Sequence, residues 1–250
     1  MISPAAAVLI AVAGLAAAVV GTAGGITSLV SYPVLLAAGV PPLPASVANL
    51  VAVVACWPGT AVSSRPELDG KGAWLRRWTW LAVVGGGLGS ALLLATPEDA
   101  FEQVVPFLVA AGSLALLFQP RLTALSGRRP RHRTGILAAG LVSVSVYSGY
   151  FGAGSGVMTL TLLLVTVDEH LPNANALKNM LIGAASVISA VIFIAFGPVE
   201  WAAVIPLGAG MFAGSLIGPR LARHTPARIL RVVIALLGTG LAIKLWISPA

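Results

Sequence analysis

The sequence has few charged residues and a single cysteine. Only 9% of its 250 residues are Asp, Glu, Lys or Arg, whereas 58% are apolar. A water-soluble domain contains about 25% charged residues, so this chain could not cover a soluble surface. The lone Cys56 excludes a disulfide scaffold, and the high hydrophobicity excludes a disordered chain. The composition therefore predicts a polytopic membrane protein.

The basic residues lie between the apolar stretches. Thirteen of the fifteen Lys and Arg residues form three clusters, which are Arg65, Lys71, Arg76 and Arg77, then Arg121, Arg128, Arg129, Arg131 and Arg133, then Arg220, Arg223, Arg228 and Arg231. They have no aromatic stacking platform, which argues against nucleic acid as a partner. Basic loops are typical of the cytoplasmic side of a membrane protein. We therefore expect a multi-pass protein of the cytoplasmic (inner) membrane, with loops 64–77, 119–133 and 220–231 inside.

Ten apolar segments succeed one another along the chain. They cover roughly residues 4–20, 26–39, 44–63, 74–95, 101–118, 134–150, 157–167, 173–196, 201–220 and 227–247. Crossing the hydrocarbon takes about 20 helical residues, and segments 26–39 and 157–167 are too short for that. Each short segment follows a glycine cluster, at residues 21–25 and 149–156. The fold class expected is therefore all-α, with glycine-broken short helices.

The two halves of the chain share one order of features. At an offset of 131 residues, Gly21 and Gly25 match Gly152 and Gly156, and Asn49 matches Asn179 after a one-residue gap. The basic loops orient helix 74–95 outward and its counterpart 201–220 inward, so the repeats are inverted. We predict two repeats of about five segments each. The first comprises residues 1–118, a basic cytoplasmic linker covers 119–133, and the second repeat covers 134–250.

Inverted repeats with paired broken helices are the architecture of secondary transporters. A half-helix that starts at Ile26 or Val157 points unpaired N–H groups and a positive dipole end into the membrane, where they can bind an anion. The glycines allow close approach to the backbone, and hydroxyl, amide and ammonium groups add donors. The predicted substrate-binding residues are Gly24, Gly25, Thr27, Ser28, Asn49, Gly154, Ser155, Gly156, Thr159, Lys178 and Asn179.

Each of these features also has a purely structural interpretation. The glycine pairs could serve helix packing, Lys178 could extend to the cytoplasmic interface, and the two asparagines could bridge helices without a ligand. For Gly85, Gly89, Gly210, Gly214 and Gly218 we favour packing. The group Asp168, Glu169 and His170 could carry a coupling proton, but a solvated turn is the favoured interpretation.

Catalysis has little support in the sequence. No metal-binding motif, pair of intramembrane carboxylates or nucleophile elbow is present, so we expect neither an enzyme nor a cofactor.

Several short motifs resemble one known family. The sequence is similar to the sulfite exporter TauE/SafE family of bacterial membrane proteins in Gly21-Thr-Ala-Gly-Gly25, Pro33-Val-Leu-Leu-Ala37, Ala48-Asn49, Gly149-Tyr-Phe-Gly-Ala-Gly-Ser-Gly156, Ala176-Leu-Lys-Asn179 and Val199-Glu-Trp201. The resemblance implies transport of sulfite, a sulfonate or another small organic anion across the cytoplasmic membrane.

The predicted function is thus secondary transport of a small anion by alternating access. An anion channel and a non-transporting membrane scaffold are the alternatives. The expected partners are the anion, a coupling proton or sodium ion and the lipid bilayer. The small-residue helices could also form a homodimer interface.

Overall fold

The computed structural model describes residues 3–124, 134–168 and 170–222, and its described elements are all α-helices. They are α1 (Pro4–Gly24), α2 (Thr27–Ala37), α3 (Pro42–Val53), α4 (Cys56–Ser63), α5 (Arg65–Leu68), α6 (Gly72–Ala95), α7 (Glu98–Ala124), α8 (Thr134–Tyr150), α9 (Ser155–Thr166), α10 (Leu171–Phe196) and α11 (Trp201–Ala222). The expected segment 227–247 and residues 125–133 of the expected linker lie outside the described residues.

Five helical stretches in the described part of the chain are long and apolar enough to cross a membrane. They are Pro4–Thr22, Pro42–Ser63, Gly72–Ala95, Leu171–Phe196 and Trp201–Gly218. Large apolar side chains on these helices face outward, for example Phe196, which is 81% exposed, and Ile205, which is 66% exposed. Such a surface suits lipid and not water. The prediction of an all-helical polytopic membrane protein is confirmed.

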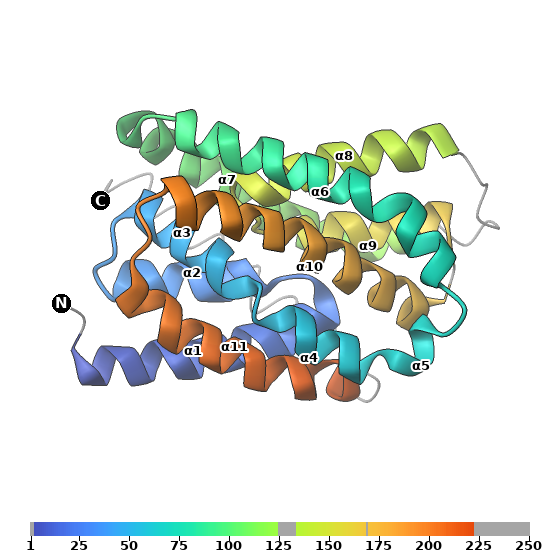
Figure 1. Cartoon of the computed structure of the whole chain (residues 1–250), viewed down its shortest axis with the longest axis horizontal. Coiled ribbons are helices and arrows are strands. Elements are labelled where there is room, and N and C mark those ends of the chain that lie inside the picture. The colour runs from blue at the N-terminus through green and yellow to red at the C-terminus, as the bar shows by residue number, and fades with distance from the viewer. Residues whose placement is uncertain (1–2, 125–133, 169, 223–250) are drawn as a thin grey trace.

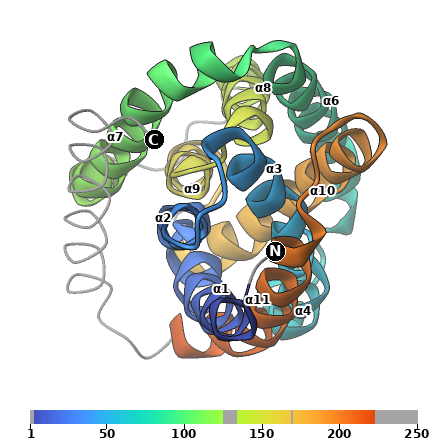
Figure 2. The same ribbon diagram turned by 90° about the vertical axis from the view of Figure 1, so that its left-hand side faces the viewer.

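Two helical hairpins enter the molecule from opposite ends. Helix α2 turns back toward the end where α1 begins, and α9 turns back toward the opposite end, where α8 begins (Figure 1). Seen end-on, α1, α11, α4, α10, α6, α8 and α7 form an open ring, and α2, α9 and α3 lie on its inner side (Figure 2). The two short helices therefore occupy the interior of the molecule, where irregular backbone is protected from lipid.

The chain breaks a third time between α3 and α4. We expected one continuous segment over 44–63, but α3 ends at Val53 and α4 begins at Cys56. Pro58 explains the break, because a proline ring clashes with the carbonyl group four residues earlier, here that of Val54. The corresponding helix α10 is continuous from Leu171 to Phe196, with its proline in the first turn, where it is tolerated.

Glycines bring two pairs of helices into close contact. Helix α1 packs along α11, and α6 packs along α8. A Cβ atom at Gly210 would overlap the carbonyl oxygen of Ala11, and one at Gly89 would overlap that of Val146. Gly85, Gly214 and Gly218 have similarly close neighbours, so the predicted packing role of these glycines is confirmed. These glycine faces of α6 and α11 already pack against α8 and α1 of the same chain. A homodimer interface would therefore need another surface.

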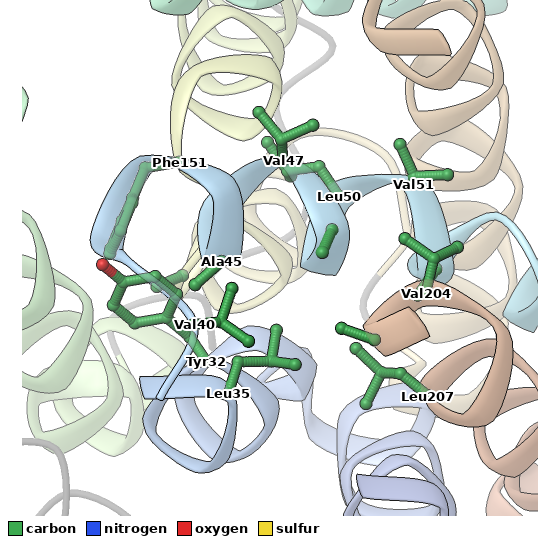
Figure 3. Packing of buried hydrophobic residues seen from close by; sticks show 14 of the residues in the cluster. Tyr32, Leu35, Val40, Ala45, Val47, Leu50, Val51, Phe151, Val204 and Leu207 are labelled. Atoms are coloured by element: carbon green, nitrogen blue, oxygen red, sulfur yellow. The ribbon is translucent and has the colours of Figure 1, made fainter. Parts of the chain in front are cut away.

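A cluster of buried apolar side chains packs α3 against both α2 and α11. Figure 3 shows Tyr32 and Leu35 of α2 facing α3, with Val204 and Leu207 of α11 close by. Tyr32 also meets Phe151 edge-on, with ring centroids 5.2 Å apart. Phe151 lies in the break between α8 and α9, so this contact anchors one broken hairpin to the other.

Candidate functional site

The two broken hairpins meet at Gly25 and Gly156. A Cβ atom at Gly25 would overlap the backbone of Gly156, and a Cβ atom at Gly156 would overlap the Cα of Gly25. Gly25 also has φ = +80°, a conformation that favours glycine. Residues that lie 131 positions apart in the sequence are therefore in direct backbone contact.

Both short helices begin at this contact. Helix α2 starts at Thr27 and α9 at Ser155, one residue later and two residues earlier than the expected Ile26 and Val157. No side chain caps either start. The first N–H groups of a helix lack acceptors within the helix, and both starts place a positive dipole end here. Some of these N–H groups are already used, because Ser155 and Val157 donate to the carbonyl oxygens of Gly152 and Gly154, and Leu29 donates to that of Ile26.

A small cavity lies beside the two helix starts. About 50 Å³ of it is open to water-sized molecules, and its wall includes seven of the eleven predicted site residues, which are Gly25, Thr27, Ser28, Ser155, Gly156, Lys178 and Asn179. The other four, Gly24, Asn49, Gly154 and Thr159, are not in the wall. The wall therefore joins the predicted residues of α2, α9 and α10.

Lys178 is buried in this wall. Its side chain is 1% exposed, and Nζ donates to the carbonyl oxygens of Gly21 and Thr22, each 3.4 Å away. These carbonyls end α1, where the negative end of the helix dipole favours a cation. The burial of Lys178 rules out the alternative in which this lysine extends to the membrane interface. Among the described residues, it is the one buried side chain with a formal charge.

The amides of α10 hold the end of α1 from the same side. Asn175 and Asn179 both donate through Nδ2 to the carbonyl oxygen of Thr22, at 3.0 and 3.1 Å. Asn179 thus bridges two helices and also lines the cavity. The helix-bridging interpretation is confirmed, and a contact of Asn179 with an anion stays a prediction.

The matching asparagine of the first half stands behind the cavity. Asn49 donates through Nδ2 to Oγ of Ser28, 2.9 Å away, and accepts from Oγ of Ser31. It therefore orients Ser28, which is in the wall. The two asparagines recur in the sequence but make different contacts.

The remaining predicted residues shape the breaks. Thr159 donates to the carbonyl oxygen of Ser155, 2.8 Å away, within α9. Gly154 precedes α9 with φ = +80° and packs against Gly112 of α7. Gly24 is the last residue of α1. These three support the helix starts without lining the cavity.

Sequence reasoning missed several wall residues. Cys56, Trp57 and Thr60 enter the wall because α4 begins at the break after α3, and Ser148, Gly183 and Ser186 enter it from α8 and α10. Pro58 was the sequence signal that could have predicted the break and so the place of Cys56, Trp57 and Thr60. The described wall contains hydroxyl, amide, indole and ammonium groups but no Asp or Glu. Its chemistry favours an anion over a cation.

Comparison with known proteins identifies the family of this chain. The family model described as "Sulfite exporter TauE/SafE" matches residues 7–245, which is nearly the whole chain. The chain belongs to the TauE/SafE family. No solved structure matches this TauE/SafE protein significantly.

Relatives of this TauE/SafE protein are named as transporters. A Haemophilus influenzae protein named "Probable membrane transporter protein" is 25% identical, with 96% of this chain and 93% of the relative aligned. "Probable membrane transporter protein ORF9" of a Sinorhizobium species is 26% identical, over 95% and 91%. "Probable membrane transporter protein YfcA" of Escherichia coli K12 is 28% identical, over 95% and 88%. The chain is thus a membrane transporter of this family, and these names describe no enzyme.

Proposed function

We propose that this protein is a secondary transporter, not an enzyme, that moves a small anion across the cytoplasmic membrane by alternating access. The anion class is sulfite, an organosulfonate or a related sulfur-containing or organic anion. A proton or a sodium ion is the proposed coupling ion. The observation that carries the proposal is the meeting of two uncapped helix starts beside the buried ammonium group of Lys178.

The donors around the cavity suit an oxyanion. Backbone N–H groups at the starts of α2 and α9, the hydroxyls of Thr27, Ser28 and Ser155, and Nζ of Lys178 can all donate to anionic oxygens. An anion that enters would compete with the carbonyl oxygens of Gly21 and Thr22 for Lys178. Binding could therefore change how α10 holds the end of α1.

The helix pairings support a two-fold, inverted arrangement. The first helix of each proposed repeat, α1 or α8, packs along a helix of the other repeat, α11 or α6. The hairpins α1–α2 and α8–α9 also enter from opposite ends of the molecule (Figure 1). We propose that 1–118 and 134–250 are the two repeats and that their relative motion opens the cavity to each side in turn.

Anion binding and anion movement are tested separately. Purified protein is screened by thermal shift with sulfite, thiosulfate, methanesulfonate and acetate, and we expect at least one anion to raise the Tm. Proteoliposomes loaded with that anion should then show saturable uptake and counterflow.

Other outcomes identify the alternatives. Anion flux without saturation or counterflow would indicate a channel. If no anion changes the Tm or crosses the membrane, the glycines serve packing and the protein is a scaffold.

A further inference from the structure

One polar atom in the cavity wall has no partner. Nε1 of Trp57, a residue of the wall, is buried and has no hydrogen-bond partner among the described residues. An indole N–H can only donate a hydrogen bond, so it needs an acceptor and cannot be satisfied by accepting a bond as a hydroxyl group can. A buried donor without an acceptor costs free energy in the empty protein, and such groups in native structures call for an explanation.

The ring of Trp57 is held by two elements. Trp57 lies in the first turn of α4, directly after the break that follows α3. On the other side, a Cβ atom at Gly183 of α10 would overlap Cδ1 of the ring and lie 2.6 Å from Nε1. The absence of a side chain at Gly183 therefore makes the space that the indole edge occupies.

The neighbours of this edge are the donors of the proposed anion site. Lys178 and Asn179 lie on α10 about one turn before Gly183, and all of them line the same cavity as Trp57. Each of these polar side chains already donates to a carbonyl oxygen at the end of α1. Nε1 of Trp57 makes no such bond, and it is covered in this structure, so an acceptor reaches it only when the ring or α10 shifts.

We infer that the indole N–H of Trp57 donates a hydrogen bond to the transported anion, and that Gly183 positions the ring for it. This assignment rests on the proposed function and adds a ligand residue from the α3–α4 break. The empty protein carries the cost of the unpaired donor, and the bound anion removes it. A ligand without an oxygen acceptor would not.

Trp57→Phe tests the assignment because it keeps an aromatic ring and removes the donor. With sulfite as the probe, we expect the Kd and the transport KM to rise about tenfold, as for the loss of one hydrogen bond to a charged group. The Tm without anion reflects two opposing changes, because the variant no longer buries an unpaired N–H but leaves a cavity where the larger ring packed. The matched control is Trp80→Phe, since Trp80 is 58% exposed and should change neither quantity.

A second variant covers the case in which Trp57→Phe does not fold. Replacing the indole by benzothiophene, in which sulfur stands for the N–H, keeps the ring shape and should weaken sulfite binding to the same extent. An unchanged Kd in either folded variant would overturn the assignment. A weaker Kd in the benzothiophene variant accompanied by a lower Tm without anion would also overturn it, because that result indicates packing only. If wild type itself binds no anion, the proposed function fails first.

Discussion

Two buried polar side chains of the cavity wall differ in whether they have a hydrogen-bond partner. Lys178 is buried and satisfied by carbonyl oxygens of α1, whereas Nε1 of Trp57 is buried and unsatisfied. A buried cation loses its hydration, and the carbonyl oxygens of α1 offset part of that cost. Substitutions at single residues should therefore change the Kd for the anion and the stability of the protein separately.

Lys178→Gln keeps a donor for the carbonyl oxygens of Gly21 and Thr22 but removes the charge. We expect the Kd for the transported anion to rise about tenfold or more, because a charge-assisted hydrogen bond becomes a neutral one. Titration followed by thermal shift measures the Kd. Lys71→Gln, at the end of the molecule, should leave it unchanged. Wild-type affinity in Lys178→Gln would remove the lysine from the proposed site.

Asp168 joins the loop before α6 to the loop before α10. Its carboxylate accepts from Nζ of Lys71, 3.2 Å away, from the backbone N–H of His170 and from Nδ2 of Asn173. Burial raises the pKa of Asp168, but these hydrogen bonds outweigh it and lower the pKa to about 2. Asp168 therefore stays ionised near neutral pH, which argues against a coupling proton on it. The neighbouring Glu169 lies outside the described residues.

Asp168→Asn should lower stability in a pH-dependent way. A carboxyl group whose pKa is lower in the folded state stabilises the protein above its unfolded pKa of about 4 and loses this contribution as the pH falls toward 2. We expect a loss of about 1 kcal/mol at pH 7, because the partner Lys71 is partly exposed, and about half of that at pH 3. Thermal unfolding at both pH values measures it. Equal losses at both would contradict the linkage, and exposed Asp69→Asn is the control.

Among the helices, the two short ones determine where the cavity forms. Helices of 11 and 12 residues cannot cross a membrane, and in this fold α2 and α9 instead meet through Gly25 and Gly156. Helix α4 adds a third break with Trp57 beside it. Close backbone contact at these breaks leaves no space for a side chain.

Gly156→Ala tests the contact between the two helix starts. The added methyl group would overlap Gly25, so we expect a destabilisation of about 1–3 kcal/mol and the loss of transport. Gly87→Ala on α6 is the matched control, because its methyl group would find its nearest neighbours at 3.7 Å. That control should be neutral or stabilise by up to about 1 kcal/mol. Normal transport by folded Gly156→Ala would contradict the proposed site.

At the scale of the whole molecule, the basic loop that contains α5, the turn between α9 and α10 and the end of α11 lie together (Figure 1). The start of α1, the turn between α6 and α7 and the turn between α10 and α11 lie at the opposite end. A cytoplasmic position for the basic end stays a prediction from the loop charges. The cavity lies between the ends, where access has to alternate for coupled transport.

Cys56 reports on that access, because it lines the cavity and is the single cysteine of the chain. In vesicles, a membrane-impermeant thiol reagent should label it slowly, and an anion at ten times its Kd should slow labelling about tenfold by occupying the cavity. Mass spectrometry of the intact protein measures the rate. Cys56→Ser controls for labelling elsewhere. Labelling that is independent of every transported anion would contradict a shared cavity.

The sequence alone was enough to predict the membrane class, the all-helical fold, the family resemblance and the two short helices. These conclusions depend on composition, segment length and glycine position, which are local properties. Residues 134–150 were predicted as a helix with the bounds that α8 has. The packing glycines of α6 and α11 were also predicted, because small residues at helical spacing leave few other roles.

Only the tertiary structure decided which residues share the cavity. It joined Gly25 to Gly156, placed Asn49 behind Ser28 and brought Trp57 against Gly183. Two of these contacts join residues more than 100 positions apart. Helix pairing determines such contacts, and hydrophobic periodicity in the sequence carries no signal for it. A buried lysine and one extending to the interface have the same spacing in a sequence, and only packing distinguishes them.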